Sequence, residues 1–442
     1  MRSAGATGLL LAAPELWVQP AIAGTPDPEQ IHLQFGSDAS REVTVSWATP
    51  ASVQHPRVNL ALSGDRGRRG GRVVQADTRP YVDLQTRIEV ITHHALLSDL
   101  EPNTSYVYSV EHDGSSQQYG SFTTAPAGRA AFRFTSFGDQ ATPESGNGLA
   151  SPWAAYNPPQ VEAMQPLFHL LNGDLCYANI SPDRVKTWHD FFTQNEVSAR
   201  YRPWMPAAGN HENEVGNGRL GWRAYQTRFS LPDHGEGNPD LRGMWYSFKA
   251  GGVRVISLNN DDVCLQDGGD NYVRGYSDGA QHNFNGADLG IRQAWLPLFD
   301  KYAVDLVLTG HEHHFERTLA VRGTDSANTL RPKVADANLG VVDTTRGTVH
   351  MIIGGGGTSA PSNQLLLDPA KSEVITEVGN QPPTSGGSAR PKRAPVKEVE
   401  DASWVGTRDK KHAPTGVPTI FDEFVLQRPR RDASAQRAGA TT

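Results

Sequence analysis

Six short apolar runs, most of them followed at once by glycine and a polar side chain, constrain the fold of this chain more than any other feature. They read FRFTSFGDQ, LFHLLNGDLCY, WMPAAGNHE, VRVISLNND, VDLVLTGHEH and TVHMIIGGGG. Helix-like segments lie between some of them, at 183–196 and 289–303. Continuous apolar strands that alternate with helices predict an α/β domain. Polar groups just past the strand ends indicate a ligand site along one edge of its sheet.

The preceding segment shows a different pattern, in which apolar side chains occupy every second position. IHLQFG, EVTVSW and SYVYSV follow this pattern, and clusters of Gly, Pro, Asn and Asp separate them. A period of two predicts short strands of an all-β sandwich. The stretch LEPNTSYVYSV resembles the corner of a fibronectin type III-like domain, where a tyrosine closes the fold after a Leu-x-Pro turn.

The chain therefore divides into four parts. We expect the fibronectin type III-like β-sandwich at 27–125 and the α/β domain at 132–360. Residues 361–442 begin with a stretch rich in Pro, Gly, Ser and Lys and are expected to form a flexible loop and a C-terminal segment. Residues 1–26 hold an Arg, a short apolar run and AIAG, which predict an export signal and an exported protein, secreted or in the cell envelope. That run is too short to span a membrane, and no transmembrane segment is expected.

Charge and cysteine content bear on function and compartment. The chain has 41 Lys and Arg against 48 Asp and Glu, a formal charge of −7, so no nucleic-acid partner is expected. The basic stretches at 66–72 and near the C-terminus are interpreted as solvated loop or tail. Two cysteines provide no disulfide framework and leave the redox compartment undetermined.

The polar groups at the strand ends form one candidate site. They are Asp139, Asp174, Tyr177, Asn210, His211, His311 and His313. Each alone is compatible with a turn, a helix cap or a structural histidine. Together, oxygen ligands and imidazoles at successive strand ends predict a centre for iron, manganese or zinc. One carboxylate can bridge two ions about 3.5–4 Å apart, as in two-metal phosphoryl hydrolysis.

The ordered motifs GDQ, GDLCY, GNHE and GHEH resemble those of the calcineurin-like metallophosphoesterases. The tyrosine in GDLCY makes the chain most similar to the purple acid phosphatases within that group. The β domain before the α/β domain is also similar to that family, so the resemblance covers about residues 30 to 360. It implies a metallophosphoesterase sandwich and metal-dependent hydrolysis of phosphate monoesters at acidic pH. The implied substrate is a small phosphate ester.

The resemblance also implies two metal ions. Asp139, Asp174, Tyr177 and His313 would bind the first, ferric iron, and the Tyr177 phenolate would produce a purple colour. Asp174 would bridge to a second divalent ion of zinc, manganese or iron.

Asn210 and His311 would complete the protein ligands of the second ion. A hydroxide held by the ions would attack phosphorus in line. His211 is assigned the catalytic role of binding the phosphate or protonating the leaving group.

Three further residues lie inside or beside these motifs. His314 and Glu316 match the family pattern and are expected to support the site rather than to bind metal. Cys176 is expected to pack in the core.

The sequence departs from the family between GNHE and GHEH. The family has a fifth motif there, a histidine at the end of another strand, but this chain runs from DGAQ directly into HNFNG near Gln281–His282. Between residues 260 and 304 only one helix and a long loop are expected, and a compact domain rarely contains so much structureless chain. We expect a helix, a strand and one ligand of the second ion to be absent. Losing even supporting groups of a metal site costs about 10–100-fold in affinity or activity. His282 is either a substitute ligand or an exposed loop residue.

Two rival functions remain. One is a degenerate relative that binds one metal or none and acts as a non-catalytic binding protein. The other is a phosphodiesterase or nucleotidase of the same superfamily, which Tyr177 disfavours because a ferric tyrosinate is the mark of the acid phosphatases. The physiological substrate, the second metal and the oligomeric state are not determined by the sequence.

Overall fold

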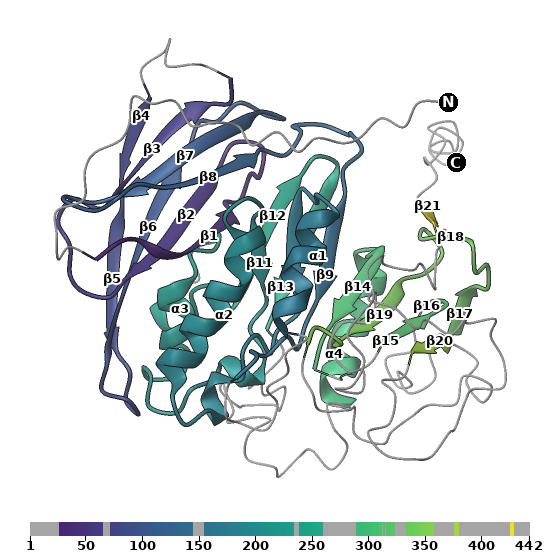
Figure 1. Cartoon of the computed structure of the whole chain (residues 1–442). Helices are drawn as coiled ribbons and strands as arrows, with labels where there is room; N and C mark the ends of the chain where they lie inside the picture. Colours follow the sequence, from purple (N-terminus) through teal and green to yellow (C-terminus); the bar gives the residue numbers. More distant parts are fainter. Residues whose placement is uncertain are drawn as a thin grey trace, which may run out of the picture.

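The computed structural model describes residues 26–64, 71–144, 154–233, 238–259, 289–311, 313, 315–322, 333–357, 375–379 and 425–427. A β-sandwich is followed by an α/β domain (Figure 1). Both parts of the predicted fold class are present. The predicted export segment, apart from Pro26, and the seam at Gln281–His282 lie outside the described residues, as does most of 361–442.

Two four-stranded antiparallel sheets form the N-terminal domain. Their strand orders are β1-β2-β6-β5 and β4-β3-β7-β8. The strands are β1 (Glu29–Phe35), β2 (Val43–Thr49), β3 (Arg57–Leu62), β4 (Arg72–Gln75), β5 (Asp77–Val82), β6 (Glu89–Leu97), β7 (Ser105–Glu111) and β8 (Gln118–Thr123). The hydroxyl of Tyr106 accepts a hydrogen bond from the backbone nitrogen of Glu101 at 2.8 Å. This is the tyrosine corner that the LEPNTSYVYSV stretch predicts.

The α/β domain begins with a parallel three-stranded sheet of order β11-β10-β9. A second sheet has the order β14-β19-β15-β20, and β12 pairs with β13 in a hairpin. The strands of these three sheets are β9 (Phe134–Phe137), β10 (Phe168–Leu171), β11 (Trp204–Pro206), β12 (Trp245–Ala250), β13 (Val253–Leu258), β14 (Leu306–Thr309), β15 (Phe315–Thr318), β19 (Val349–Ile353) and β20 (Ile375–Gly379). The backbone nitrogen of Gly138 donates to the carbonyl of Ile353 at 2.8 Å, so the ends of β9 and β19 join the two sheets.

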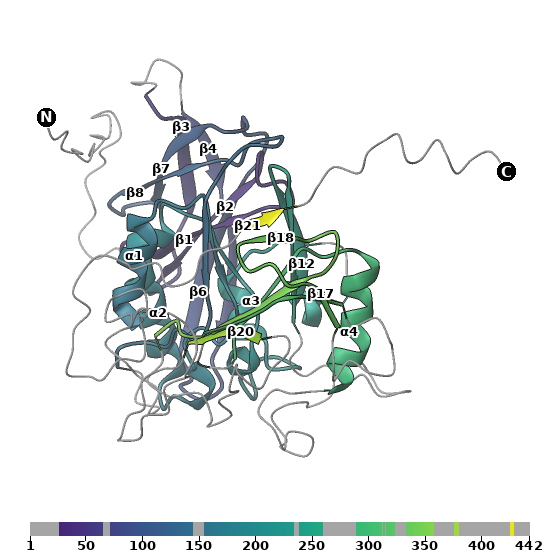
Figure 2. The same ribbon diagram turned by 90° about the vertical axis from the view of Figure 1, so that its right-hand side faces the viewer.

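Helices and two small sheets surround these strands. The helices are α1 (Asn157–Ala163), α2 (Arg184–Ala199), α3 (Arg223–Arg228) and α4 (Leu289–Lys301), with short 3₁₀ turns η2 (Ala154–Tyr156), η3 (Ala178–Ile180), η4 (Asn210–Glu212) and η5 (Pro239–Leu241). The small sheets pair β16 (Ala320–Arg322) with β17 (Lys333–Asp336) and β18 (Val341–Asp343) with β21 (Val425–Gln427). Figure 2 shows α1 and α2 on the opposite side of the molecule from α4. In the described part of the chain, no helix is long and apolar enough to cross a membrane.

Each of the six apolar runs forms a strand. In sequence order they are β9, β10, β11, β13, β14 and β19. The two helix-like segments form α2 and α4. Strong periodicity and continuous apolar character therefore predicted these elements correctly, with their ends shifted by a few residues.

One hydrophobic core runs through both domains. Phe35 of β1 packs against Phe168 of β10 and Phe248 of β12, with ring centroids 6.0 Å apart in both pairs. Trp47 and the other inward side chains of the sandwich belong to the same buried cluster. Because the core is shared, the sandwich is packed directly on the domain that carries the candidate site.

Candidate metal centre

The seven predicted site residues lie just after the ends of four strands. Asp139 follows β9, and Asp174 and Tyr177 follow β10, the adjacent strand. Asn210 and His211 form η4 after β11. The remaining two, His311 and His313, follow β14 of the second sheet. Since β9 and β19 join the sheets, the sequence-distant ends meet at one place.

The backbone at this place is unusually strained. Four of the seven residues adopt left-handed conformations with positive φ, namely Asp139 (59°), Asp174 (52°), Tyr177 (60°) and His311 (73°). Such conformations cost non-glycine residues about 1–3 kcal/mol each and persist only where surrounding contacts determine them. Their concentration here is typical of a functional site.

Two glycines allow the loops to approach closely. A Cβ on Gly209 would lie 2.4 Å from Oδ1 of Asp174, and a Cβ on Gly310 would lie 2.7 Å from Oδ2 of Asp139. The glycines of GNHE and GHEH therefore each make room for a carboxylate that follows another strand. The backbone nitrogen of His311 also donates to Oδ2 of Asp139 at 2.8 Å, which ties the β14 loop to the end of β9.

The first group of donor atoms comprises the side chains of Asp139, Tyr177 and His313. The Tyr177 hydroxyl lies 3.1 Å from Oδ1 of Asp139 and 2.9 Å from Nε2 of His313. Nε2 of His313 lies 3.2 Å from the same carboxylate oxygen. Asp139 and Tyr177 are fully buried, and the His313 side chain is 13% exposed.

The second group comprises Asp174, Asn210 and His311. Nδ1 of His311 lies 3.5 Å from Oδ2 of Asp174 and 3.0 Å from Oδ1 of Asn210. In the alternative orientation of the Asn210 amide, its nitrogen replaces Oδ1 at this position and donates to both carboxylate oxygens of Asp174 at 3.2 Å. Metal ligation requires the orientation in which Oδ1 faces the group. Asp174 is buried, whereas the His311 side chain is 42% exposed. This group therefore lies nearer the surface than the first.

The spacing of the donor atoms fits metal ligation. Ligands held about 2.1 Å from one ion, at right angles, lie about 3 Å from each other. The three separations in the first group are 2.9, 3.1 and 3.2 Å, and the second group is slightly wider. Among the described residues, no three His, Cys, Asp or Glu side chains form a metal-binding group on their own. Each group contains two such residues and needs the phenol of Tyr177 or the amide of Asn210 as its third donor.

Burial and neighbouring charges perturb the acids of the site. Burial raises the pKa of Asp139 to about 6, although a neighbouring histidine opposes it. Burial acts to raise the pKa of Asp174, but positive charge on His211 and His311 outweighs it and holds that pKa below its usual range. Burial and the Asp139 carboxylate hold the pKa of the Tyr177 hydroxyl well above its usual value. A bound cation would favour the charged forms of these groups.

His211 lies between the two groups and has partners of its own. Its backbone nitrogen donates to Oδ1 of Asp174 at 3.0 Å, and its ring packs on Tyr177 with centroids 4.2 Å apart. Its Nδ1 hydrogen-bonds Oδ1 of Asn179 at 2.8 Å. Burial lowers the pKa of His211. Its other ring nitrogen, Nε2, is therefore the one left to interact with a ligand.

The sequence-based interpretation missed two residues. Asn179 orients the His211 ring, and its signal was its place two residues after Tyr177 in GDLCYAN. Glu212 is fully buried and accepts hydrogen bonds from the backbone nitrogens of Gly209 (2.8 Å), Asp174 (2.9 Å) and Leu175 (2.7 Å). It holds the loops after β10 and β11 together, and its signal was the last letter of GNHE.

Of the three further residues inside or beside the motifs, the structure describes the side chain of one, Cys176. Cys176 is fully buried in an apolar cluster that includes Leu175 and Trp188. His314 and the side chain of Glu316 lie outside the described residues.

The fold and this cluster define a calcineurin-like metallophosphoesterase, and comparisons with known proteins agree. The family described as Purple acid Phosphatase, N-terminal domain, matches residues 28–124, and the Calcineurin-like phosphoesterase family matches 154–315. This chain belongs to the purple acid phosphatase family and, with it, to the metal-dependent phosphoesterases. The recognition made from the motifs is confirmed.

Three relatives illustrate the range of similarity. An uncharacterised protein of Mycobacterium tuberculosis is 45% identical over 97% of this chain and 93% of its own length. The Fe(3+)-Zn(2+) purple acid phosphatase 12 of Arabidopsis thaliana is 25% identical over 76% of this chain and 73% of its own length. A purple acid phosphatase structure from yellow lupin seeds has a TM-score of 0.62 at 20% identity, covering 80% of this chain and 69% of the lupin chain.

The mycobacterial alignment also shows a length difference. It extends over 499 positions, whereas this chain has 442 residues, so at least 499 − 442 = 57 positions have no counterpart here. The relative therefore contains segments that this chain lacks.

Proposed function

We propose that this protein is an acid phosphatase that hydrolyses small phosphate monoesters at a centre of two metal ions. The convergence of seven oxygen and nitrogen side chains from four strand ends is the observation that supports this proposal best. Family membership supports the broader class of metal-dependent phosphoesterases. Acidic and histidine side chains in two adjoining groups suit two ions that share a carboxylate.

Each group has a distinct role in this proposal. Ferric iron would be held by the first group, Asp139, Tyr177 and His313, together with Asp174. A buried phenol beside two carboxylates suits this role because it can bind the ion as a phenolate. Asp174 would also contribute to the second group, which would hold zinc, manganese or iron. The Arabidopsis relative is named as an Fe(3+)-Zn(2+) enzyme. When bound, such ions neutralise phosphate charge and lower the pKa of water.

His211 is the proposed catalytic side chain. Asn179 engages its Nδ1 and Tyr177 supports one side of its ring, so the imidazole is oriented before a substrate binds. When the ring is protonated, Nε2–H can donate to a phosphate oxygen or pass its proton to the leaving oxygen, tasks that suit imidazole. Fixing the ring in advance reduces the entropy lost on reaching the transition state.

The test is elemental analysis of the purified full-length chain combined with an assay on 4-nitrophenyl phosphate. We expect two metal ions per chain, at least one of them iron, a purple absorption band, and monoester hydrolysis that is fastest at acidic pH. A fully metallated protein without the band would refute the ferric-tyrosinate assignment. Faster hydrolysis of bis(4-nitrophenyl) phosphate than of the monoester would favour the phosphodiesterase alternative.

A second candidate function is a non-catalytic relative with an impaired second metal site. The length difference from the mycobacterial relative favours it, because at least 57 aligned positions are absent from this chain. The predicted loss of a helix, a strand and a histidine near Gln281–His282 is one place where they could fall. One ion or none per chain, without hydrolysis of either ester, would support this candidate.

A further inference from the structure

The turn between β5 and β6 of the sandwich reaches the loops of the candidate site. This turn, Asp83–Ile88, lies at the end of a long hairpin that extends along α3 (Figure 1). Its first residue, Asp83, is fully buried. Oδ1 of Asp83 accepts hydrogen bonds from the backbone nitrogen of Thr86 at 2.7 Å and its hydroxyl at 2.8 Å, which closes the turn.

The other carboxylate oxygen of Asp83 binds the loop that follows η4. Oδ2 accepts a hydrogen bond from Nδ2 of Asn217 at 2.6 Å, and the backbone nitrogen of Leu84 donates to Oδ1 of Asn217 at 2.8 Å. One side-chain amide of the α/β domain is therefore held at both ends by two consecutive residues of the sandwich. The Leu84 side chain packs so closely on Gly216 that a Cβ there would lie 1.9 Å from Cδ2.

The loop that contains Asn217 directly follows η4. This short turn carries His211 and Asn210, a candidate metal ligand. Asn217 donates a second hydrogen bond to the buried Glu214 at 2.5 Å, and Glu214 accepts another from the indole of Trp188 in α2 at 2.6 Å. The backbone nitrogen of Glu214 donates to the carbonyl of Gly221 at 2.9 Å, which closes the loop on itself. A displacement of Asn217 would therefore move a connected unit that starts at η4.

The same turn contacts the loop that follows β10. Nε2 of Gln85 donates to the carbonyl of Ser181 at 3.2 Å. Ser181 ends η3, and its backbone nitrogen donates to the carbonyl of Ala178 at 3.0 Å. This short 3₁₀ turn follows Tyr177 and contains Asn179, the partner of His211.

We propose that the β5–β6 turn is a positioning element for the metal centre. The sandwich supplies none of the seven cluster residues, yet this turn contacts both loops on which Tyr177, Asn210 and His211 lie. Strained backbone at a functional site persists only when surrounding structure determines it, and Asp174 and Tyr177 have positive φ. The kinetic part of this inference rests on the proposed phosphatase activity.

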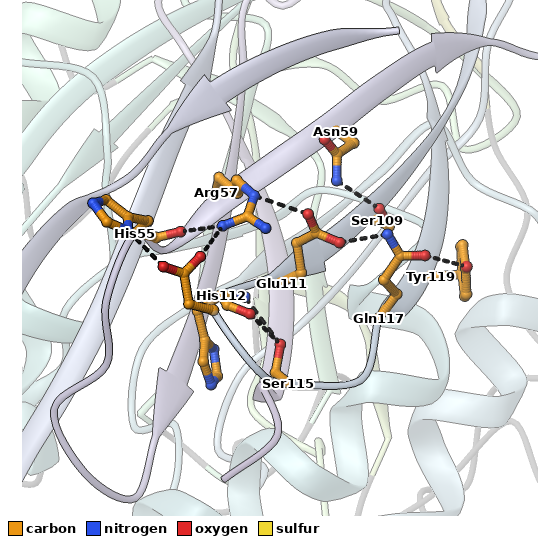
Figure 3. Close-up of polar contacts among 10 residues, drawn as sticks. His55, Arg57, Asn59, Ser109, Glu111, His112, Ser115, Gln117 and Tyr119 are labelled. Carbon is orange, nitrogen blue, oxygen red and sulfur yellow. Dashed lines mark hydrogen bonds and ion pairs between the residues drawn. The ribbon is translucent and has the colours of Figure 1, made fainter. Parts of the chain in front are cut away.

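The sandwich offers a matched control in a different place. Glu111 of β7, whose side chain is 8% exposed, accepts hydrogen bonds from Nε of Arg57 at 2.8 Å and from Nε2 of Gln117 (Figure 3). Both partners belong to the sandwich itself. Glu111→Ala and Asp83→Ala each remove a buried, hydrogen-bonded carboxylate of the same domain, but only Asp83 contacts the site loops.

The experiment compares hydrogen exchange and kinetics of the full-length protein and its variants. In Asp83→Ala we expect faster amide exchange in peptides covering 174–181 and 209–222, and kcat about 10–100-fold lower, the range seen when supports of a metal site are removed. Glu111→Ala should leave both peptides and kcat unchanged. Asp83→Asn, which retains one oxygen able to accept from Asn217, should recover part of the loss.

Two further comparisons distinguish failure of the positioning role from failure of the proposed phosphatase activity. Gln85→Ala changes an exposed side chain, so the variant should fold normally. It should speed amide hydrogen exchange only in the 174–181 peptide. Equal exchange in both peptides for wild type, Asp83→Ala and Gln85→Ala would overturn the positioning role. If wild type with bound metals hydrolyses no monoester, the proposed function fails, while the exchange comparison still decides whether the turn orders the loops.

Discussion

A buried histidine in the central strand of the parallel sheet should make the protein sensitive to acid. His169 lies in β10, is fully buried, and its ring contacts those of Phe137 and Trp204, with centroids 4.3 and 4.4 Å away. Its Nδ1 hydrogen-bonds the hydroxyl of Thr135 at 2.8 Å, and its Nε2 has no hydrogen-bond partner among the described residues. Burial lowers the pKa of His169 from 6.5 to about 3.

The sign and size of the effect follow from proton linkage. Between pH 6.5 and 3 the unfolded chain protonates this histidine while the folded chain does not, so the folded state becomes less stable as pH falls. Each pH unit below 6.5 costs about 1.4 kcal/mol, which amounts to about 2 kcal/mol at pH 5. Little of this cost remains at pH 7.5.

The variant is His169→Leu, which removes the titrating group and keeps an apolar side chain against the two aromatic rings. Urea unfolding at pH 7.5 and pH 5 gives the free energy of unfolding of both proteins. Whatever the offset at pH 7.5, the variant should gain about 2 kcal/mol relative to wild type on going to pH 5.

The control is Thr135→Val, which removes the hydrogen-bond partner and leaves the histidine in place. Its stability should change with pH in parallel with wild type. A difference between wild type and His169→Leu that is the same at both pH values, within about 0.5 kcal/mol, would refute the assignment of this acid sensitivity to His169.

The remaining predictions concern the proposed metal centre. Tyr177→Phe should abolish the purple absorption band, measured by visible spectroscopy on metal-loaded protein, because it removes the phenol beside the first ion. His211→Ala should lower kcat about 100-fold or more with metal content unchanged by elemental analysis, and loss of metal would instead make His211 structural. Asn179→Ala should lower kcat about 10-fold, without loss of metal, by freeing the His211 ring. Stepwise chelation should remove the ion beside His311 first and the ion beside His313 later, because their side chains are 42% and 13% exposed, and activity should fall with the first loss.

The strands were predictable because their sequence signals are local. Period-two alternation identified β1, β2 and β7, and continuous apolar runs identified the strands of the α/β domain. The positions of the site residues followed from the same logic, since the ends of neighbouring parallel strands lie together. The tyrosine corner was predictable because a short motif specifies it.

The contacts that support the site were not predictable in this way. Asp139, Tyr177 and His311 adopt positive φ, and residue type alone does not locate such positions, because the strain is imposed by tertiary contacts. The hydrogen bonds from Asn217 to Asp83 join residues 134 positions apart, and no local pattern connects them. The same is true of Asn179, whose role depends on where the His211 ring lies.

The two donor groups also differ in the burial of their side chains. This difference gives an experimental distinction between the rival functions. Asp139, Tyr177 and His313 are buried donors, two of them following adjacent parallel strands. The second group depends on the more exposed His311, and the predicted missing histidine belongs to it. Any impairment should therefore affect the second ion and spare the first. One ion per chain with an intact purple band is then the signature of the degenerate relative. If the predicted histidine is absent, two ions per chain would mean that His282 or another donor completes the second group.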